Sequence, residues 1–265
     1  MKLNIVPART GIQWVKLGVR TFLKQPLALT GLFFMYMAVV LVISQLPVVG
    51  IVVGAMLVPA ATLGLMAATA EASAGRFPMP TVLVSAFRAG KQRARAMLVL
   101  GVLYTVGSLL ASLLGGLLAG APAAPAVTPD EMQAPQLDTR TMLILLLHTP
   151  LVVLFWHAPA LVHWHGISPV KSLFFSAVAC LRNFGALFMY GVTWMAVFLV
   201  VGFIVSTVGM MLGGVAVARS IMMPTVLLLV AMFSTSLYFT FRDSFQADDV
   251  PGPDAAGPPG GGETP

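Results

Sequence analysis

Histidines are the residues of this chain whose type and spacing could bind a metal ion or haem. Three of the four, His157, His163 and His165, lie within nine residues of one another, and His148 lies just upstream. At about 100° per residue around a helix, His148 and His157 point to opposite faces, and His157 and His165 differ by about 80°. No cysteine or carboxylate stands beside them at a metal-ligand spacing. The pattern therefore predicts no metal and no cofactor, and it favours a polar and aromatic belt at a membrane interface.

Groups that could catalyse a reaction are equally sparse. Cys180 is the single cysteine, and no histidine or carboxylate lies near it in the sequence. The common nucleophile, zinc and phosphate-loop motifs do not occur. The acidic residues lie outside the interiors of the long apolar runs, with Glu71 at the end of one. Cation-coupled transporters generally hold carboxylates within the membrane. The lack of carboxylates inside the apolar runs therefore argues against a cation-coupled transporter. We therefore expect a protein that is not an enzyme.

The composition predicts that these residues are carried by membrane-spanning helices. The 265 residues are 58% hydrophobic and only 9% charged, whereas soluble domains carry about 25% charged residues. Six apolar runs reach the roughly 20 residues that a helix needs to cross a bilayer. The predicted fold is therefore an all-α, polytopic membrane protein whose transmembrane domain covers residues 27–245. Its predicted spans are residues 27–46, 47–70, 97–119, 141–165, 184–208 and 220–241.

The positive charges predict the orientation of these spans. Thirteen of the 15 lysines and arginines fall on one side of the predicted membrane, and only Arg140 and Arg219 fall on the other. Positive residues stay in the cytoplasm, so both termini are expected there, in the inner membrane of a bacterium. Residues 1–26 are then a cytoplasmic amphipathic segment, 120–140 a periplasmic loop and 246–265 a disordered acidic tail. Basic residues next to apolar runs are typical of contact with lipid headgroups. The positive net charge therefore does not indicate a nucleic-acid partner, and none is expected.

Basic or semi-polar segments precede the first, third and fifth predicted spans, at residues 11–26, 81–96 and 168–187. They predict amphipathic helices on the cytoplasmic surface of the membrane, and with the hairpins that follow they suggest a threefold repeat of surface helix plus hairpin. The favoured function is contact with anionic lipid, or with a partner protein, at the cytoplasmic leaflet. The residues expected to contact lipid headgroups are Lys16, Arg20, Lys24, Arg88, Lys91, Arg93 and Arg95, of which Arg93 lies off the face that Arg88, Lys91 and Arg95 share.

Two prolines leave an alternative function open. Pro59 and Pro159 lie inside predicted spans, where a proline frees the backbone carbonyls of the preceding turn. Together with His157 they would form a transport site for a small or amphiphilic solute between two kinked hairpins.

A pattern of residues along the fourth predicted span and the segment after it carries a family resemblance. It consists of Trp156, Ala158 to Leu161, Ser168-Pro169, Lys171, Ser176 and Arg182-Asn183. With the amphipathic start at residue 11, this pattern resembles an uncharacterised family of six-span inner-membrane proteins of proteobacteria. More distantly, it is similar to the membrane domain attached to some bacterial glycerophosphodiester phosphodiesterases. The resemblance implies a multi-span fold but assigns no activity, because no phosphodiesterase domain is expected here.

Overall fold

The computed structural model describes residues 2–47, 49–120 and 138–246. The predicted tail after residue 246 and most of the predicted periplasmic loop lie outside the described residues. The described chain is helical except for one antiparallel pair of two-residue strands and the connecting segments. In chain order its elements are β1 (Lys2–Leu3), α1 (Thr10–Lys24), α2 (Pro26–Ser44), α3 (Val49–Ser73), the 3-10 helix η1 (Pro80–Val84), α4 (Ser85–Arg88), α5 (Lys91–Leu118), α6 (Thr139–Phe155), α7 (Ala158–His165), α8 (Pro169–Arg182), α9 (Phe184–Ser244) and β2 (Phe245–Gln246).

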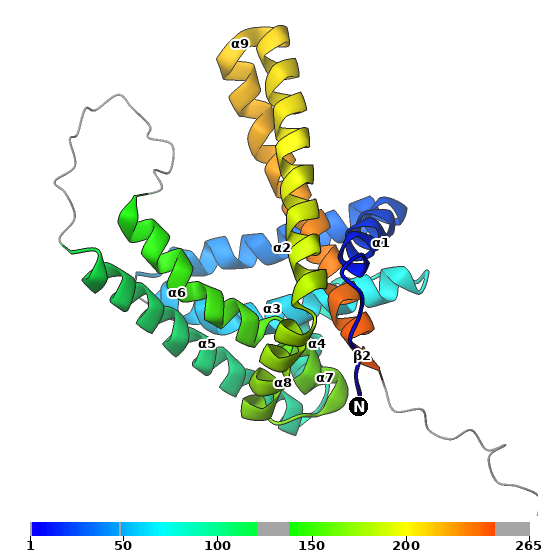
Figure 1. Cartoon of the computed structure of the whole chain (residues 1–265), viewed down its shortest axis with the longest axis vertical. Coiled ribbons are helices and arrows are strands. Elements are labelled where there is room, and N and C mark those ends of the chain that lie inside the picture. Colours follow the sequence, from blue (N-terminus) through cyan, green and yellow to red (C-terminus); the bar gives the residue numbers. More distant parts are fainter. Residues whose placement is uncertain (1, 48, 121–137, 247–265) are drawn as a thin grey trace, which may run out of the picture.

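Five helical stretches of the described chain are long and apolar enough to cross a membrane: α2, α3, α5, α6 taken with α7, and α9. The last is 61 residues long and turns back on itself at Gly213 and Gly214, where the backbone leaves the helical conformation. Gly214 adopts a φ of 72°, a left-handed value that side chains disfavour. Figure 1 shows α9 as a hairpin of two long helices. We call residues 184–212 its first arm and residues 215–244 its second arm.

The hairpins expose apolar side chains at their far ends. Figure 1 shows α5 running beside α6, while the hairpin of α9 extends away from the other helices. Leu118 at the end of α5 is 67% exposed, and Leu212 at the turn of α9 is 75% exposed. Exposed apolar surface on this scale is costly in water and favourable in hydrocarbon, so these ends require lipid around them.

Helix α1 packs across the base of the α9 hairpin and contacts both arms. A methyl group at Gly11 would come within 2.1 Å of the Ala186 carbonyl oxygen, and one at Gly18 within 2.4 Å of the Ser236 Cβ. Between them Trp14 is fully buried, and its indole Nε1 donates a hydrogen bond of 2.9 Å to the Asp243 carboxylate. The sequence predicted an amphipathic helix on the cytoplasmic surface of the membrane, with its apolar face, which includes Trp14, in lipid. The structure differs because the face covers protein instead.

The basic segment at residues 81–96 also differs from its prediction. The sequence predicted one surface helix here, but the structure has η1 and α4, then a break, then the start of α5. The break falls at Gly90, whose φ is 102°, a conformation open to glycine and strained for other residues. As a result Arg88 ends α4, whereas Lys91, Arg93 and Arg95 lie in the first turns of α5. Arg88 is therefore separated from the face that Lys91 and Arg95 still share.

The ends of the described chain are tied together at the base of α9. Lys2 and Leu3 pair with Gln246 and Phe245, and Figure 1 shows the N-terminus beside β2. Asn183, which precedes α9, accepts a hydrogen bond from the Val6 N–H at 2.9 Å and donates one to the Asn4 carbonyl at 3.0 Å. This buried network fixes the segment that leads into α1.

Candidate functional site

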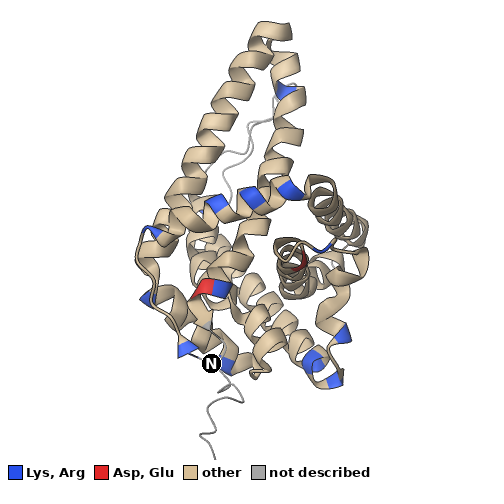
Figure 2. Ribbon diagram, turned by 90° about the vertical axis from the view of Figure 1, so that its right-hand side faces the viewer, with Lys and Arg blue, Asp and Glu red and all other residues tan. Residues whose placement is uncertain are grey.

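A row of cations lies along the exposed face of α1. Lys16, Arg20 and Lys24 are four residues apart, so they share one side of the helix, and all three are exposed. Figure 2 shows cationic residues side by side on a helix that crosses beneath the α9 hairpin. The opposite side of α1 is held against α9 through Gly11 and Gly18. The docking of α1 therefore fixes the direction in which the cations point.

Lys16, Arg20 and Lys24 also line, almost wholly through their aliphatic stems, a groove of about 620 Å³ between α1 and the first arm of α9. Aliphatic side chains and one threonine make up the rest of its lining: Ile12, Val15, Val19, Leu23, Thr193 and Val197. A groove with three cations and an aliphatic surface matches an anionic amphiphile, whose phosphate would lie at the cations and whose hydrocarbon would lie against the valines. We call it the α1 groove.

The second group of predicted headgroup contacts is spread over two helices. Arg88, Lys91, Arg93 and Arg95 are all exposed. Three of them occupy the first turns of α5, where the positive end of the helix dipole disfavours cations by about 0.3–1 kcal/mol each. Helix stability therefore does not explain their position.

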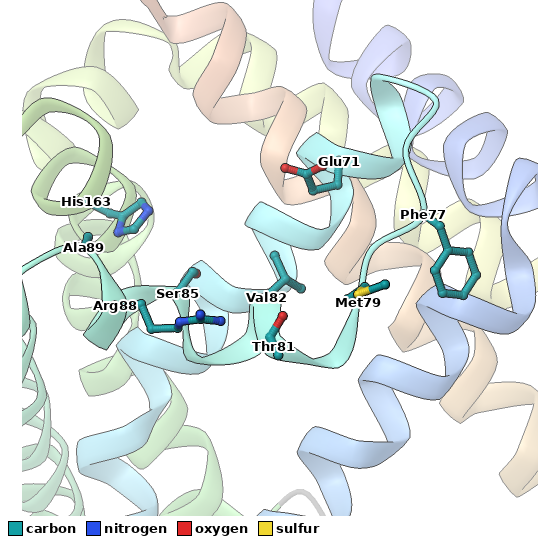
Figure 3. Close-up of a pocket in the computed structure, with 9 residues that line it drawn as sticks. All are labelled: Glu71, Phe77, Met79, Thr81, Val82, Ser85, Arg88, Ala89 and His163. Atoms are coloured by element: carbon teal, nitrogen blue, oxygen red, sulfur yellow. The ribbon is translucent and has the colours of Figure 1, made fainter.

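Arg88 also lines a pocket of about 490 Å³ that sequence reasoning missed (Figure 3). Glu71 from the end of α3 and His163 from α7 line it too, together with Ser85 at the start of α4. Among the described residues, the Ser85 Oγ and the His163 Nδ1 have no hydrogen-bond partner. No local sequence pattern indicates this pocket, because its residues come from helices far apart in the chain.

The predicted transport residues lie in packed protein. Pro59 is buried inside α3. Pro159 is buried in the first turn of α7, where a proline costs no hydrogen bond. His157 is 1% exposed, and its ring lies 5.4 Å from that of Phe245. The neighbouring residues Ala60 and Ala158 belong to one packed apolar cluster.

The fourth predicted span is broken between α6 and α7, and a side chain from α8 completes the break. The His157 N–H donates to the Ser176 Oγ at 3.0 Å, and that hydroxyl donates in turn to the Val153 carbonyl at 2.9 Å. In an unbroken helix the His157 N–H would bond directly to the Val153 carbonyl. Ser176 is thus inserted into one helical hydrogen bond, which is a recognised cause of helix kinks. The predicted span over 141–165 corresponds to α6 and α7 together, which form one candidate membrane span, and the break lies just before Pro159.

The four histidines do not converge. His148 faces Ser108 at 3.2 Å and the Ile144 carbonyl at 2.8 Å, whereas His163 lines the pocket of Figure 3. Within residues 2–47, 49–120 and 138–246, no three His, Cys, Asp or Glu side chains are grouped so as to hold a metal ion.

Comparison with known proteins gives one informative relative. The chain is 34% identical over 267 residues to a probable inner membrane protein of Burkholderia thailandensis, and the alignment covers 96% of this chain and 97% of that protein. This chain belongs to the same family. No family model matches it, and no solved structure matches it. The similarity to membrane domains of glycerophosphodiester phosphodiesterases stays a prediction.

Family membership and the exposed apolar helices lead to the same description of the molecule. The relative is a probable inner membrane protein, and five stretches of the described chain could cross a bilayer. The chain is therefore a membrane protein, and its α1 groove lies against a hairpin whose apolar arms require lipid.

Proposed function

We propose that this protein binds anionic phospholipid at the cytoplasmic leaflet of the inner membrane and catalyses no reaction. The observation that carries the proposal is the α1 groove, in which Lys16, Arg20 and Lys24 line the same 620 Å³ space as aliphatic side chains. Arg88, Lys91, Arg93 and Arg95 add a second cationic region. Each cation near an anionic membrane surface contributes about 1 kcal/mol of attraction.

The proposal includes six membrane spans with both termini in the cytoplasm. A straight helix of 61 residues would be about 90 Å long, which is three times the hydrocarbon thickness of about 30 Å. The turn at Gly213 and Gly214 instead divides α9 into two arms of suitable length. Helices α2, α3 and α5, with the broken pair α6–α7, supply the other four spans.

The threefold repeat remains part of the same proposal. In chain order α1 precedes the α2–α3 hairpin, η1 and α4 precede the α5–α6 hairpin, and α8 precedes the α9 hairpin. In this repeat α1 packs on α9 and not on the α2–α3 hairpin that follows it. This contact would join the first repeat unit to the third.

Lipid retention tests the proposal. The full-length protein is purified in mild detergent with phosphatidylglycerol and studied by native mass spectrometry. Replacing Lys16, Arg20 and Lys24 by glutamine should weaken retention of phosphatidylglycerol about tenfold or more, because three attractions of about 1 kcal/mol are lost. The matched control replaces Lys2, Arg9 and Lys171 by glutamine, which removes the same charge outside the groove. Equal retention by the two triple variants would contradict the proposal.

Transport is a second candidate, because the break between α6 and α7 resembles the discontinuous helices at which transporters bind solutes. Against it stand the insertion of Ser176 into the break and the burial of His157. Solute flux into proteoliposomes that is lost on Pro59→Ala and Pro159→Ala would favour transport, and retention of lipid without flux would favour the first proposal.

A further inference from the structure

The pocket of Figure 3 carries both signs of charge on separate walls. Glu71 comes from the end of α3, and Arg88 comes from the end of α4. Figure 3 shows the Glu71 carboxylate on one side, the Arg88 guanidinium on another, and Ser85 and Val82 between them. Among the described residues, the two charges form no ion pair with each other. A ligand that satisfies both must itself carry a cation and an anion.

Glu71 and Arg88 both remain able to bind a ligand. Glu71 pairs with Arg76 through its Oε2 atom, and its side chain is 38% exposed, which leaves the carboxylate accessible. Arg88 is exposed and, within the described chain, takes part in neither of the ion pairs found there. A guanidinium offers several N–H donors in a planar fork that matches phosphate.

Two further polar side chains of the pocket add hydrogen-bonding capacity. The Ser85 Oγ and the His163 Nδ1 have no partner among the described residues, and both side chains line the pocket. Unpaired buried polar atoms are destabilising unless a ligand or water completes their hydrogen bonds. A phosphate oxygen is a suitable acceptor for the serine hydroxyl.

The rim of the pocket points to a lipid rather than a soluble metabolite. Phe77 and Met79 line the pocket from the loop between α3 and η1, and they are 67% and 66% exposed. Large apolar side chains on an exposed loop beside cations are typical of segments that enter the membrane interface. A ligand in this pocket would therefore meet hydrocarbon at one edge and charge at the other.

We infer that this pocket binds the headgroup of a zwitterionic phospholipid that carries a primary amine, as in phosphatidylethanolamine. Arg88 and Ser85 would hold the phosphate, Glu71 would accept hydrogen bonds from the ammonium group, and Phe77 and Met79 would lie against the acyl chains. Phosphatidylcholine should bind less well, because its trimethylammonium has no N–H to donate. The inference rests on the proposed function only in placing the pocket at the cytoplasmic leaflet.

Competition between lipids in native mass spectrometry tests the inference on the full-length protein. Equal amounts of phosphatidylethanolamine, phosphatidylcholine and phosphatidylglycerol are offered to the wild type and to single variants. The wild type should retain phosphatidylethanolamine over phosphatidylcholine about fivefold. Glu71→Gln should abolish this preference and leave phosphatidylglycerol unchanged, and Arg88→Gln should weaken retention of phosphatidylethanolamine. Arg182→Gln, which removes an exposed arginine outside this pocket, is the control and should retain the preference.

Other outcomes overturn the inference. Equal retention of the two zwitterionic lipids by the wild type would do so, as would an unchanged preference in Glu71→Gln. Displacement of phosphatidylethanolamine by soluble glycerophosphoethanolamine would mean that the ligand is a soluble phosphoamine. Because Glu71→Gln also loses the ion pair to Arg76, Ser85→Ala is a second variant and should weaken phosphatidylethanolamine retention. The triple glutamine variant of the α1 groove should keep the preference, so failure of the proposed function and failure of this inference are distinguishable.

Discussion

At the scale of single residues, the hydroxyl of Ser176 does the work of a missing helical hydrogen bond. It accepts from the His157 N–H and donates to the Val153 carbonyl, so both backbone groups at the break are satisfied without water. In a membrane protein this matters because an unpaired backbone group is costly where no water is present. Pro159 gave a sequence signal for an interruption, but the serine that completes it lies on another helix, and its role depends on the packing of α8.

Removing that hydroxyl should destabilise the protein. Ser176→Ala leaves the buried His157 N–H unpaired and the Val153 carbonyl with only the weak Cys180 thiol donor at 3.7 Å, and we expect the free energy of unfolding to fall by about 1–3 kcal/mol. Unfolding in mixed micelles, followed by circular dichroism as the denaturing detergent is increased, measures the change. Ser220→Ala is the control, because Ser220 is exposed and donates only to the Ala216 carbonyl of its own helix. A loss in Ser176→Ala no larger than in the control would contradict this account.

Cys180 is predicted to be unreactive while the protein is folded. Burial raises the pKa of its thiol from 9.0 to about 12, so the thiolate fraction near pH 8 falls roughly a thousandfold. Iodoacetamide at pH 8 should therefore leave the folded protein unmodified and label it fully in hot dodecyl sulfate, as intact mass will show. Because the folded pKa is raised, this cysteine lowers stability only as the pH rises past 9.0 toward 12. Rapid labelling of the folded protein at pH 8 would refute the burial.

At the scale of elements, the sequence predicted where helices lie better than what they contact. The first predicted span, 27–46, corresponds to α2 at Pro26–Ser44, because a long apolar run leaves few alternatives to a helix. The sequence also predicted that α1 has one apolar face, but it did not predict that this face packs against α9. Lipid and the α9 hairpin both accept an apolar helix face, so the helical pattern alone does not distinguish them.

The two glycines of α1 now identify its partner and can be tested. Gly18→Val places a side chain where the Ser236 Cβ would be only 2.4 Å away, so α1 should detach from α9. We expect a loss of at least about 1–3 kcal/mol in stability, faster proteolysis within residues 10–24 and weaker retention of phosphatidylglycerol. Gly31→Ala in α2 is the control, because a methyl group there meets no atom within 4 Å. Wild-type proteolysis of Gly18→Val would show that α1 is not held in this way.

The candidate sites differ in how far the sequence could predict them. Four-residue spacing was enough to place Lys16, Arg20 and Lys24 on one face, because they belong to one helix. Arg88 could not be assigned to its pocket in that way. The pocket needs Glu71 and His163, whose positions depend on how α3 and α7 pack beside α4, and no local pattern encodes that packing.

At the scale of the whole molecule, the hairpin of α9 makes the number of spans testable. With six spans, both termini lie in the cytoplasm, whereas an unturned α9 would place them on opposite sides. Green fluorescent protein fused at either end should therefore fluoresce, since it does not fold when exported through the general secretion pathway in unfolded form. In a Cys180→Ala background, Arg140→Cys should react with an impermeant maleimide from the periplasm, and Lys91→Cys only after lysis. A dark C-terminal fusion would contradict the six-span topology.

The pairing of β1 with β2 has a consequence for biosynthesis. Lys2 and Leu3 leave the ribosome first, yet their partners Phe245 and Gln246 are synthesised after every apolar helix of the described chain. The surface of α1 around Trp14 must therefore stay uncovered until α9 has been inserted. The β1–β2 pair can therefore form only after α9 has been synthesised, and a nascent chain halted before α9 would expose α1 to proteases.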